Sequence, residues 1–150
     1  MAENRQFCTF LVNGLLFGIE VLKVQEVIRY QPMTRVPLAP SMVRGLINLR
    51  GQIVTAVDLR ERLELPPRAA DQLPMNVVIR CEDGAVSLLA DDIGDVLEVG
   101  SEGFEPPPRT LTGAARDLVT GVYKLKDRLL LVLDTAKAMN FGGSSTTAEA

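Results

Sequence analysis

The sequence predicts an all-β fold built from small barrels. Short runs of apolar and β-branched residues recur along the chain with turn residues between them, whereas helical patterns are few and short. The second half of the chain repeats the order of the first half. Closing a short sheet into a barrel removes its exposed edges. We therefore expect one domain over residues 7–139, with similar lobes at 7–65 and 74–139.

The first predicted element is a β-hairpin. Residues 7–12 and 15–20 are strand-like runs, and Asn13-Gly14 lies between them. Both turn residues tolerate positive φ, which favours a type I′ turn. After a bend near Val21, the β-branched residues predict another strand from about Val24.

A loop and a second hairpin come next. Three prolines between residues 31 and 40 lack a backbone N–H and disfavour helix at the residues before them, which predicts a loop there. Residues 47–49 and 53–57 then form strands around Arg50-Gly51-Gln52.

A short helix is expected at residues 59–65. Asp58 precedes it as an N-cap, and Glu61 at the third helical position is placed to reach back as in a capping box. Pro66-Pro67 ends the helix.

The second half carries the repeat. Residues 75–81 and 85–90 predict another hairpin, and residues 93–97 match residues 24–28 in the order of apolar, acidic and branched side chains. A gapless alignment of residues 45–63 with 121–139 pairs Gly45 with Gly121, Arg50 with Lys126 and Asp58 with Asp134. Both copies therefore predict strand, turn, strand and capped helix.

Two further segments are expected to lack regular structure. The loop at residues 104–112 contains three consecutive prolines with fixed φ and is expected to be stiff. Residues 140–150 are mostly small or polar, so we expect a disordered tail.

Composition excludes several classes of function. The chain has 150 residues, 47% of them hydrophobic, which suffices for a buried core. Its net charge of −3 argues against a nucleic-acid binder. The polar start does not resemble a signal peptide, and no apolar run reaches the roughly 18 residues of a membrane span. We expect a cytoplasmic protein without direct membrane insertion.

The side chains of common catalytic sites are scarce. The chain contains no histidine, which removes the commonest general base and metal ligand. Cys8 and Cys81 are far apart in sequence and lie in strand-like runs, so they predict reduced thiols rather than a zinc site or a disulfide framework. Glycine-rich nucleotide-binding motifs are missing. We expect no cofactor, no metal and no catalysis.

A rival hypothesis concerns the acidic pair Asp91-Asp92 at the end of an apolar run. Such a pair could hold magnesium in a phosphoacceptor or a hydrolase. A receiver domain, however, needs strands alternating with long helices, whereas hairpins dominate this chain. We expect the pair to decorate a solvent-facing turn instead.

Four motifs resemble a known family. They are Phe-Gly-Ile at 17–19, Lys-Val-Gln-Glu at 23–26, Gly-Leu-Ile-Asn-Leu-Arg-Gly at 45–51 and Val-Asp-Leu-Arg at 57–60. In this order and spacing they resemble the CheW family of bacterial chemotaxis adaptors, over about residues 7–139. The resemblance implies two intertwined five-stranded SH3-like β-barrels with short capping helices. Thr55 stands where the family usually has proline, so the resemblance does not predict the shape of the neighbouring surface.

The resemblance also implies a function. CheW-like adaptors couple the cytoplasmic tips of chemoreceptors to the regulatory domain of the histidine kinase CheA within membrane-associated receptor arrays, and they catalyse nothing. A related chemosensory pathway, controlling surface motility, type IV pili or biofilm formation, is an alternative. The free protein is expected to be a monomer.

Candidate site residues follow from the matching motifs. The implied receptor-facing positions are Val24, Glu26, Val27, Arg50 and Ile53. The implied kinase contacts are Tyr30, Val36 and Met42, and the implied array contacts are Phe104 and Leu111. Composition alone would instead place Val24 and Ile53 in the core and make Glu26 and Arg50 an ordinary surface pair. Gly45 and Gly51 are expected to serve unusual φ or close backbone approach.

Overall fold

The computed structural model describes residues 4–81, 84–100 and 103–139. Within these ranges the strands form two sheets, which confirms the all-β prediction. The six-stranded sheet has the order β8-β1-β2-β11-β10-β9, and the five-stranded sheet has the order β3-β6-β7-β5-β4. The strands of the first sheet are β1 Asn4–Val12, β2 Leu15–Glu20, β8 Asp92–Gly100, β9 Phe104–Glu105, β10 Val119–Lys124 and β11 Leu129–Leu133. Those of the second are β3 Val24–Ile28, β4 Val43–Leu49, β5 Gln52–Asp58, β6 Met75–Cys81 and β7 Gly84–Ala90.

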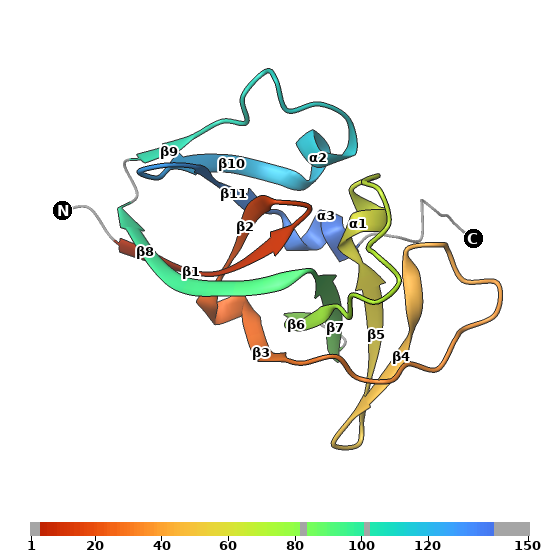
Figure 1. Ribbon diagram of the computed structural model, residues 1–150. Helices are drawn as coiled ribbons and strands as arrows, with labels where there is room; N and C mark the ends of the chain where they lie inside the picture. The colour runs from red at the N-terminus through yellow and green to blue at the C-terminus, as the bar shows by residue number, and fades with distance from the viewer. Residues whose placement is uncertain (1–3, 82–83, 101–102, 140–150) are drawn as a thin grey trace, which may run out of the picture.

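Each half of the chain contributes a hairpin to the sheet of the other half. The β1–β2 hairpin lies between β8 and β11, and the β6–β7 hairpin lies between β3 and β5 (Figure 1). Parallel pairing of β2 with β11 and of β7 with β5 fixes these insertions. The predicted intertwining is therefore confirmed. The sheets do not follow the expected lobes 7–65 and 74–139, however, because the two hairpins are exchanged.

Two tight turns account for the hairpins of the first half. Asn13 and Gly14 have φ of 53° and 80°, as the predicted type I′ turn requires. Arg50 and Gly51 have φ of 50° and 90°, so this turn has two residues at its centre, rather than the three expected. The side chain of Asn48 accepts a hydrogen bond from the Gly51 amide at 2.9 Å. The Asn-Leu-Arg-Gly motif thus encodes a specific turn.

Two equivalent glycines, Gly45 and Gly121, show that the sequence repeat is also a structural repeat. A Cβ atom on Gly45 would lie 2.6 Å from the Thr34 carbonyl oxygen, and one on Gly121 would lie 2.6 Å from the Glu105 carbonyl oxygen. In both copies the preceding segment crosses so closely that only glycine fits. In the second copy this segment is β9, so the expected loop at 104–112 begins with a short strand.

Three clusters of buried hydrophobic side chains stabilise the packing of the two sheets. The main cluster lies between them and includes Phe10 and Phe17 from one sheet and Val57 and Leu88 from the other. Each sheet also curls around a cluster of its own. These smaller clusters are Ile47, Leu49, Val54, Ala56, Val78, Ala85 and Leu89 in the five-stranded sheet, and Phe7, Leu16, Tyr123, Leu130 and Val132 in the six-stranded sheet. Two barrels with a shared interface result.

The helices are short. They are the 3-10 helix η1 Val21–Lys23 and the α-helices α1 Leu59–Arg62, α2 Gly113–Leu118 and α3 Thr135–Met139. None of the helices in the described ranges is long and apolar enough to cross a membrane. Helix α2 was not predicted, because Leu118 is its one buried residue and its sequence shows no apolar periodicity.

The expected capping is partly confirmed. Asp58 Oδ1 accepts a hydrogen bond from the Arg60 amide at 3.0 Å, as an N-cap should. The expected capping box is wrong, because the Glu61 carboxylate instead accepts from Ser41 Oγ at 3.2 Å and pairs with Arg44. The helix ends earlier than residue 65, and Glu64 follows with φ of 60°.

Cys8 and Cys81 are not joined in a disulfide, and both residues are half-buried. Burial raises the pKa of the Cys8 thiol, which keeps it protonated and poorly nucleophilic. The expected tail at 140–150 lies outside the described residues.

Candidate partner-binding surface

An ion pair joins the two outer strands of the five-stranded sheet. Arg50, in the β4–β5 turn, donates to the Glu26 carboxylate on β3. Strands β3 and β4 stand at opposite ends of the strand order, so this contact shows that the sheet curls until its edges meet. The Glu26 side chain is 21% exposed and the Arg50 side chain 72% exposed. The pair therefore presents a fixed carboxylate beside a solvent-facing guanidinium.

A β-bulge sets the direction of the Glu26 side chain. The register of β3 on β6 shifts between Val24 and Glu26, which makes Gln25 the extra residue. Bulges bend a strand and re-aim its side chains. The side-chain amide of Gln25 (Nε2) donates to Glu26 Oε2 at 3.3 Å and to Gln52 Oε1 at 3.2 Å.

The apolar receptor-facing candidates divide into two kinds. Ile53 is 60% exposed and Val27 is 36% exposed, so both are open to a partner. Val24 is half-buried and packs against the main core cluster. The composition-based expectation of a core position thus holds for Val24 and is wrong for Ile53.

One exposed valine was missed. Val96 on β8 is 58% exposed. The repeat pairs residues 93–97 with 24–28, which places Val96 opposite Val27 in the alignment. This alignment was the signal that could have identified it.

The kinase-facing candidates surround the loop between β3 and β4. Val36 is exposed, Tyr30 is half-buried, and Met42 packs against the main cluster. Leu38 in the same loop is fully exposed with φ of 66°, a conformation that a leucine rarely adopts. A cavity of about 650 Å³ opens along this loop. Leu38 is therefore the most prominent apolar side chain here, and sequence reasoning missed it.

Of the array-contact candidates, Phe104 lies in β9 of the six-stranded sheet and Leu111 lies in the loop between β9 and α2. The Phe104 ring packs against Tyr123 with centroids 5.2 Å apart, and Arg5 lies over the Phe104 ring at 5.8 Å. Phe104 stays partly exposed. Leu111 is half-buried and packs against the main cluster.

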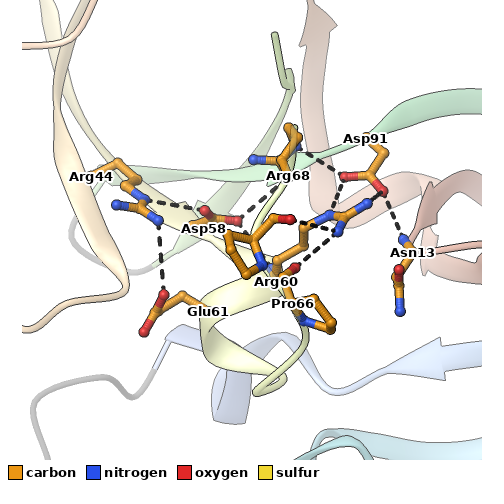
Figure 2. A network of polar contacts seen from close by, with 9 residues as sticks. Asn13, Arg44, Asp58, Arg60, Glu61, Pro66, Arg68 and Asp91 are labelled. Carbon is orange, nitrogen blue, oxygen red and sulfur yellow. Dashed lines mark hydrogen bonds and ion pairs between the residues drawn. The ribbon is translucent and has the colours of Figure 1, made fainter. Parts of the chain in front are cut away.

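A second polar cluster lies where the two sheets meet. Asp91, at the end of β7, accepts from Arg60 at 2.6 Å and 2.9 Å and from Arg68 at 3.0 Å. Arg68 also pairs with Asp58 at 3.4 Å. Figure 2 shows Arg60 and Arg68 pointing at Asp91, whose other neighbour is the Asn13 amide at 2.7 Å. The cluster ties the segment after α1 to both sheets.

The four ionised side chains of this cluster are largely shielded from water. Their exposures are 5% for Asp58, 8% for Arg68, 10% for Asp91 and 12% for Arg60. Burial acts to raise the pKa of Asp91, but hydrogen bonds from Arg60, the Asn13 amide and Arg68 outweigh it and lower the pKa. The Asp91 carboxyl is therefore ionised at neutral pH.

The expectation of a solvent-facing pair is wrong for Asp91, whereas Asp92 is exposed. Asp91 is not on a solvent-facing turn, because two guanidinium groups cover it. Its oxygens are occupied by those donors, so they are not open to magnesium or to phosphoryl transfer. Asp92 Oδ1 accepts from the Ile93 amide at 2.9 Å. In the described part of the chain, no three acidic, cysteine or histidine side chains form a metal-binding group.

The sequence matches a known family of domains. The model of the CheW-like domain matches residues 6–141. The chain belongs to the CheW-like domain family. The resemblance inferred from the four motifs is confirmed, and with it a place among the adaptor proteins of chemotaxis.

Individual CheW proteins are similar to this CheW-like chain along most of its length. The chemotaxis protein CheW of Klebsiella aerogenes is 30% identical over 137 residues, which cover 91% of this chain and 82% of the relative. The CheW of Bacillus subtilis is 31% identical over 131 residues, covering 87% and 84% of the two chains. The crystal structure of the scaffolding protein TtCheW from Thermoanaerobacter tengcongensis superposes with a TM-score of 0.79 at 25% identity, over 88% of this chain and 90% of that one.

Proposed function

We propose that this CheW-like protein couples chemoreceptors to the histidine kinase CheA as a scaffold without catalytic activity. It is recruited from the cytoplasm to receptor arrays, where one surface binds the receptor tip and another binds the regulatory domain of CheA. Coupling of this kind works through position, because differential contacts in two receptor states bias the kinase between its own states.

The Glu26–Arg50 pair beside exposed Ile53 is the observation that carries the proposal. A helical partner needs an apolar contact bordered by polar groups. Ile53 supplies apolar area at the edge of the barrel. Arg50, three residues earlier, supplies a donor, and its partner Glu26 supplies an acceptor. Val27 adds a second exposed apolar side chain on β3.

The kinase surface is assigned to the loop between β3 and β4. Its exposed Val36 and Leu38 offer apolar side chains on a segment stiffened by prolines, so little conformational entropy is lost on binding. This surface is separate in sequence from the Arg50 turn. Because the two binding surfaces of the protein differ, it can bind the receptor and the kinase at the same time.

Separate binding measurements test the two assignments. Purified protein is expected to bind a helical-hairpin fragment of a receptor tip and, in a second titration, the isolated regulatory domain of CheA. Ile53→Asp should weaken the first interaction, and Leu38→Asp the second, each by about tenfold, because each substitution places a charge in an apolar contact. Ile53→Asp should leave the affinity for the CheA domain unchanged, and Leu38→Asp should leave the affinity for the receptor fragment unchanged. Loss of both interactions in either variant would contradict the two-surface assignment.

A further inference from the structure

The seam of the five-stranded barrel is closed by side chains. Gln25 on β3 donates to Gln52 at the start of β5 at 3.2 Å, and both side chains are half-buried. The same Gln25 amide nitrogen lies 3.3 Å from Glu26 Oε2. The carboxylate therefore has two donors, the Gln25 amide and the Arg50 guanidinium. The Gln25 side-chain amide thus links Gln52 on β5 to the Glu26–Arg50 ion pair.

The corresponding seam of the six-stranded sheet is open. The repeat pairs Gln25 with Gly94 and Gln52 with Arg128. There a cavity of about 290 Å³ occupies the seam, with Gly94, Asp95, Leu97 and Arg128 among its lining residues. A Cβ atom on Gly94 would lie 2.4 Å from Thr9 Oγ1, so any larger residue here would have to displace the Thr9 side chain. The two barrels share a fold, yet only the five-stranded barrel has a side-chain hydrogen bond across this seam in the described residues. The residue types at these two positions decide it.

We propose that Gln25 and Gln52 are positioning residues that close this seam and fix the Glu26 carboxylate before a receptor helix binds. The inference rests on the proposed receptor contact. A carboxylate held by two donors loses little freedom on binding, and each side chain immobilised beforehand lowers the cost of association. Gln52 thus acts on the receptor through Glu26 rather than by touching it.

Gln52→Leu tests this inference, with Gln72→Leu as the matched control. Gln52 is half-buried beside a turn and Gln72 is exposed between α1 and β6. Gln52→Leu should weaken binding of the receptor-tip fragment about three- to tenfold. Affinity for the CheA regulatory domain and the thermal melt should stay unchanged. Amide hydrogen exchange over residues 24–28 should become faster, since the strand loses its contact across the seam. Gln72→Leu should change none of these.

A double-mutant cycle separates positioning from a general structural role. If Gln52 acts through Glu26, then Gln52→Leu combined with Glu26→Gln should bind the receptor fragment no more weakly than Glu26→Gln alone. Additive losses would overturn the inference, as would equal losses of receptor and kinase affinity. Unchanged hydrogen exchange in Gln52→Leu would overturn the closure of the seam. If Gln52→Leu does not fold, Gln25→Leu replaces it in the same cycle. Failure of the unsubstituted chain to bind the receptor fragment would overturn the receptor assignment itself, and this inference with it.

Discussion

Asp91→Asn is expected to lower the free energy of unfolding by about 3–5 kcal/mol, the largest stability loss among the substitutions considered. The change removes the carboxylate that Arg60 and Arg68 share, so that Arg60 loses its ion-pair partner and Arg68 keeps only Asp58. Uncompensated buried charge is among the most costly defects in a folded protein. Urea-induced unfolding followed by circular dichroism measures the loss.

The neighbouring residue provides the control for this experiment. Asp92 is exposed, so Asp92→Asn should change stability by less than about 0.5 kcal/mol. Equal and small effects of the two substitutions would show that the cluster contributes little to the junction of the sheets.

Acid should weaken the same cluster. The pKa of Asp91 is lower in the folded chain than in the unfolded chain. Its stabilisation is therefore complete above the ordinary aspartate pKa of about 4 and is lost as pH falls through the lowered pKa of the folded state. Asp91→Asn has no carboxyl group at this position, so this part of the acid dependence should be missing from the variant.

Arg50→Glu is expected to have the largest effect on function. The new carboxylate would face Glu26 at the barrel edge, where like charges repel and the donor for a receptor helix is gone. Co-sedimentation with receptor-containing membranes should fall at least about tenfold, and receptor-dependent kinase activation should fall with it. Because the Arg50 side chain is mostly exposed, unfolding should change by less than about 1 kcal/mol.

Arg109→Glu is the matched control, since Arg109 is an exposed arginine in the loop after β9. It carries the same charge change and should leave co-sedimentation intact. Coupling by Arg50→Glu at the level of the unsubstituted protein would reject Arg50 as a receptor contact. Loss of coupling together with loss of folding would give Arg50 a structural role instead.

Local chemistry explains which parts of the fold the sequence revealed. Asn13-Gly14 and Arg50-Gly51 encode tight turns through φ preferences that belong to individual residues, so both hairpins were predictable. Intertwining of the two halves was predicted only through the family resemblance, because it depends on parallel pairing of β2 with β11 and of β5 with β7. Such pairings join strands far apart in sequence, and periodicity within a strand does not specify its partner.

The candidate surface shows the same limit. Composition predicted Glu26 and Arg50 as an ordinary surface pair, and the structure places them in contact. The family resemblance made them receptor-facing candidates. Composition favoured a core position for Ile53, whereas the register of β4 and β5 turns it outward. The role of Asp91 was also hidden, because its partners Arg60 and Arg68 lie on the far side of the β6–β7 hairpin in sequence. Their convergence requires the assembled sheets.

A sedimentation measurement shows whether the protein bridges receptor and kinase. Receptor-containing membranes are mixed with purified CheA in the presence or absence of this protein, and the kinase in the pellet is quantified. We expect kinase to accumulate with the membranes only when the protein is present, in proportion to the amount of protein bound, and not when Arg50→Glu replaces it. Equal sedimentation of kinase with and without the protein, although both separate interactions occur, would contradict its role as a coupling scaffold.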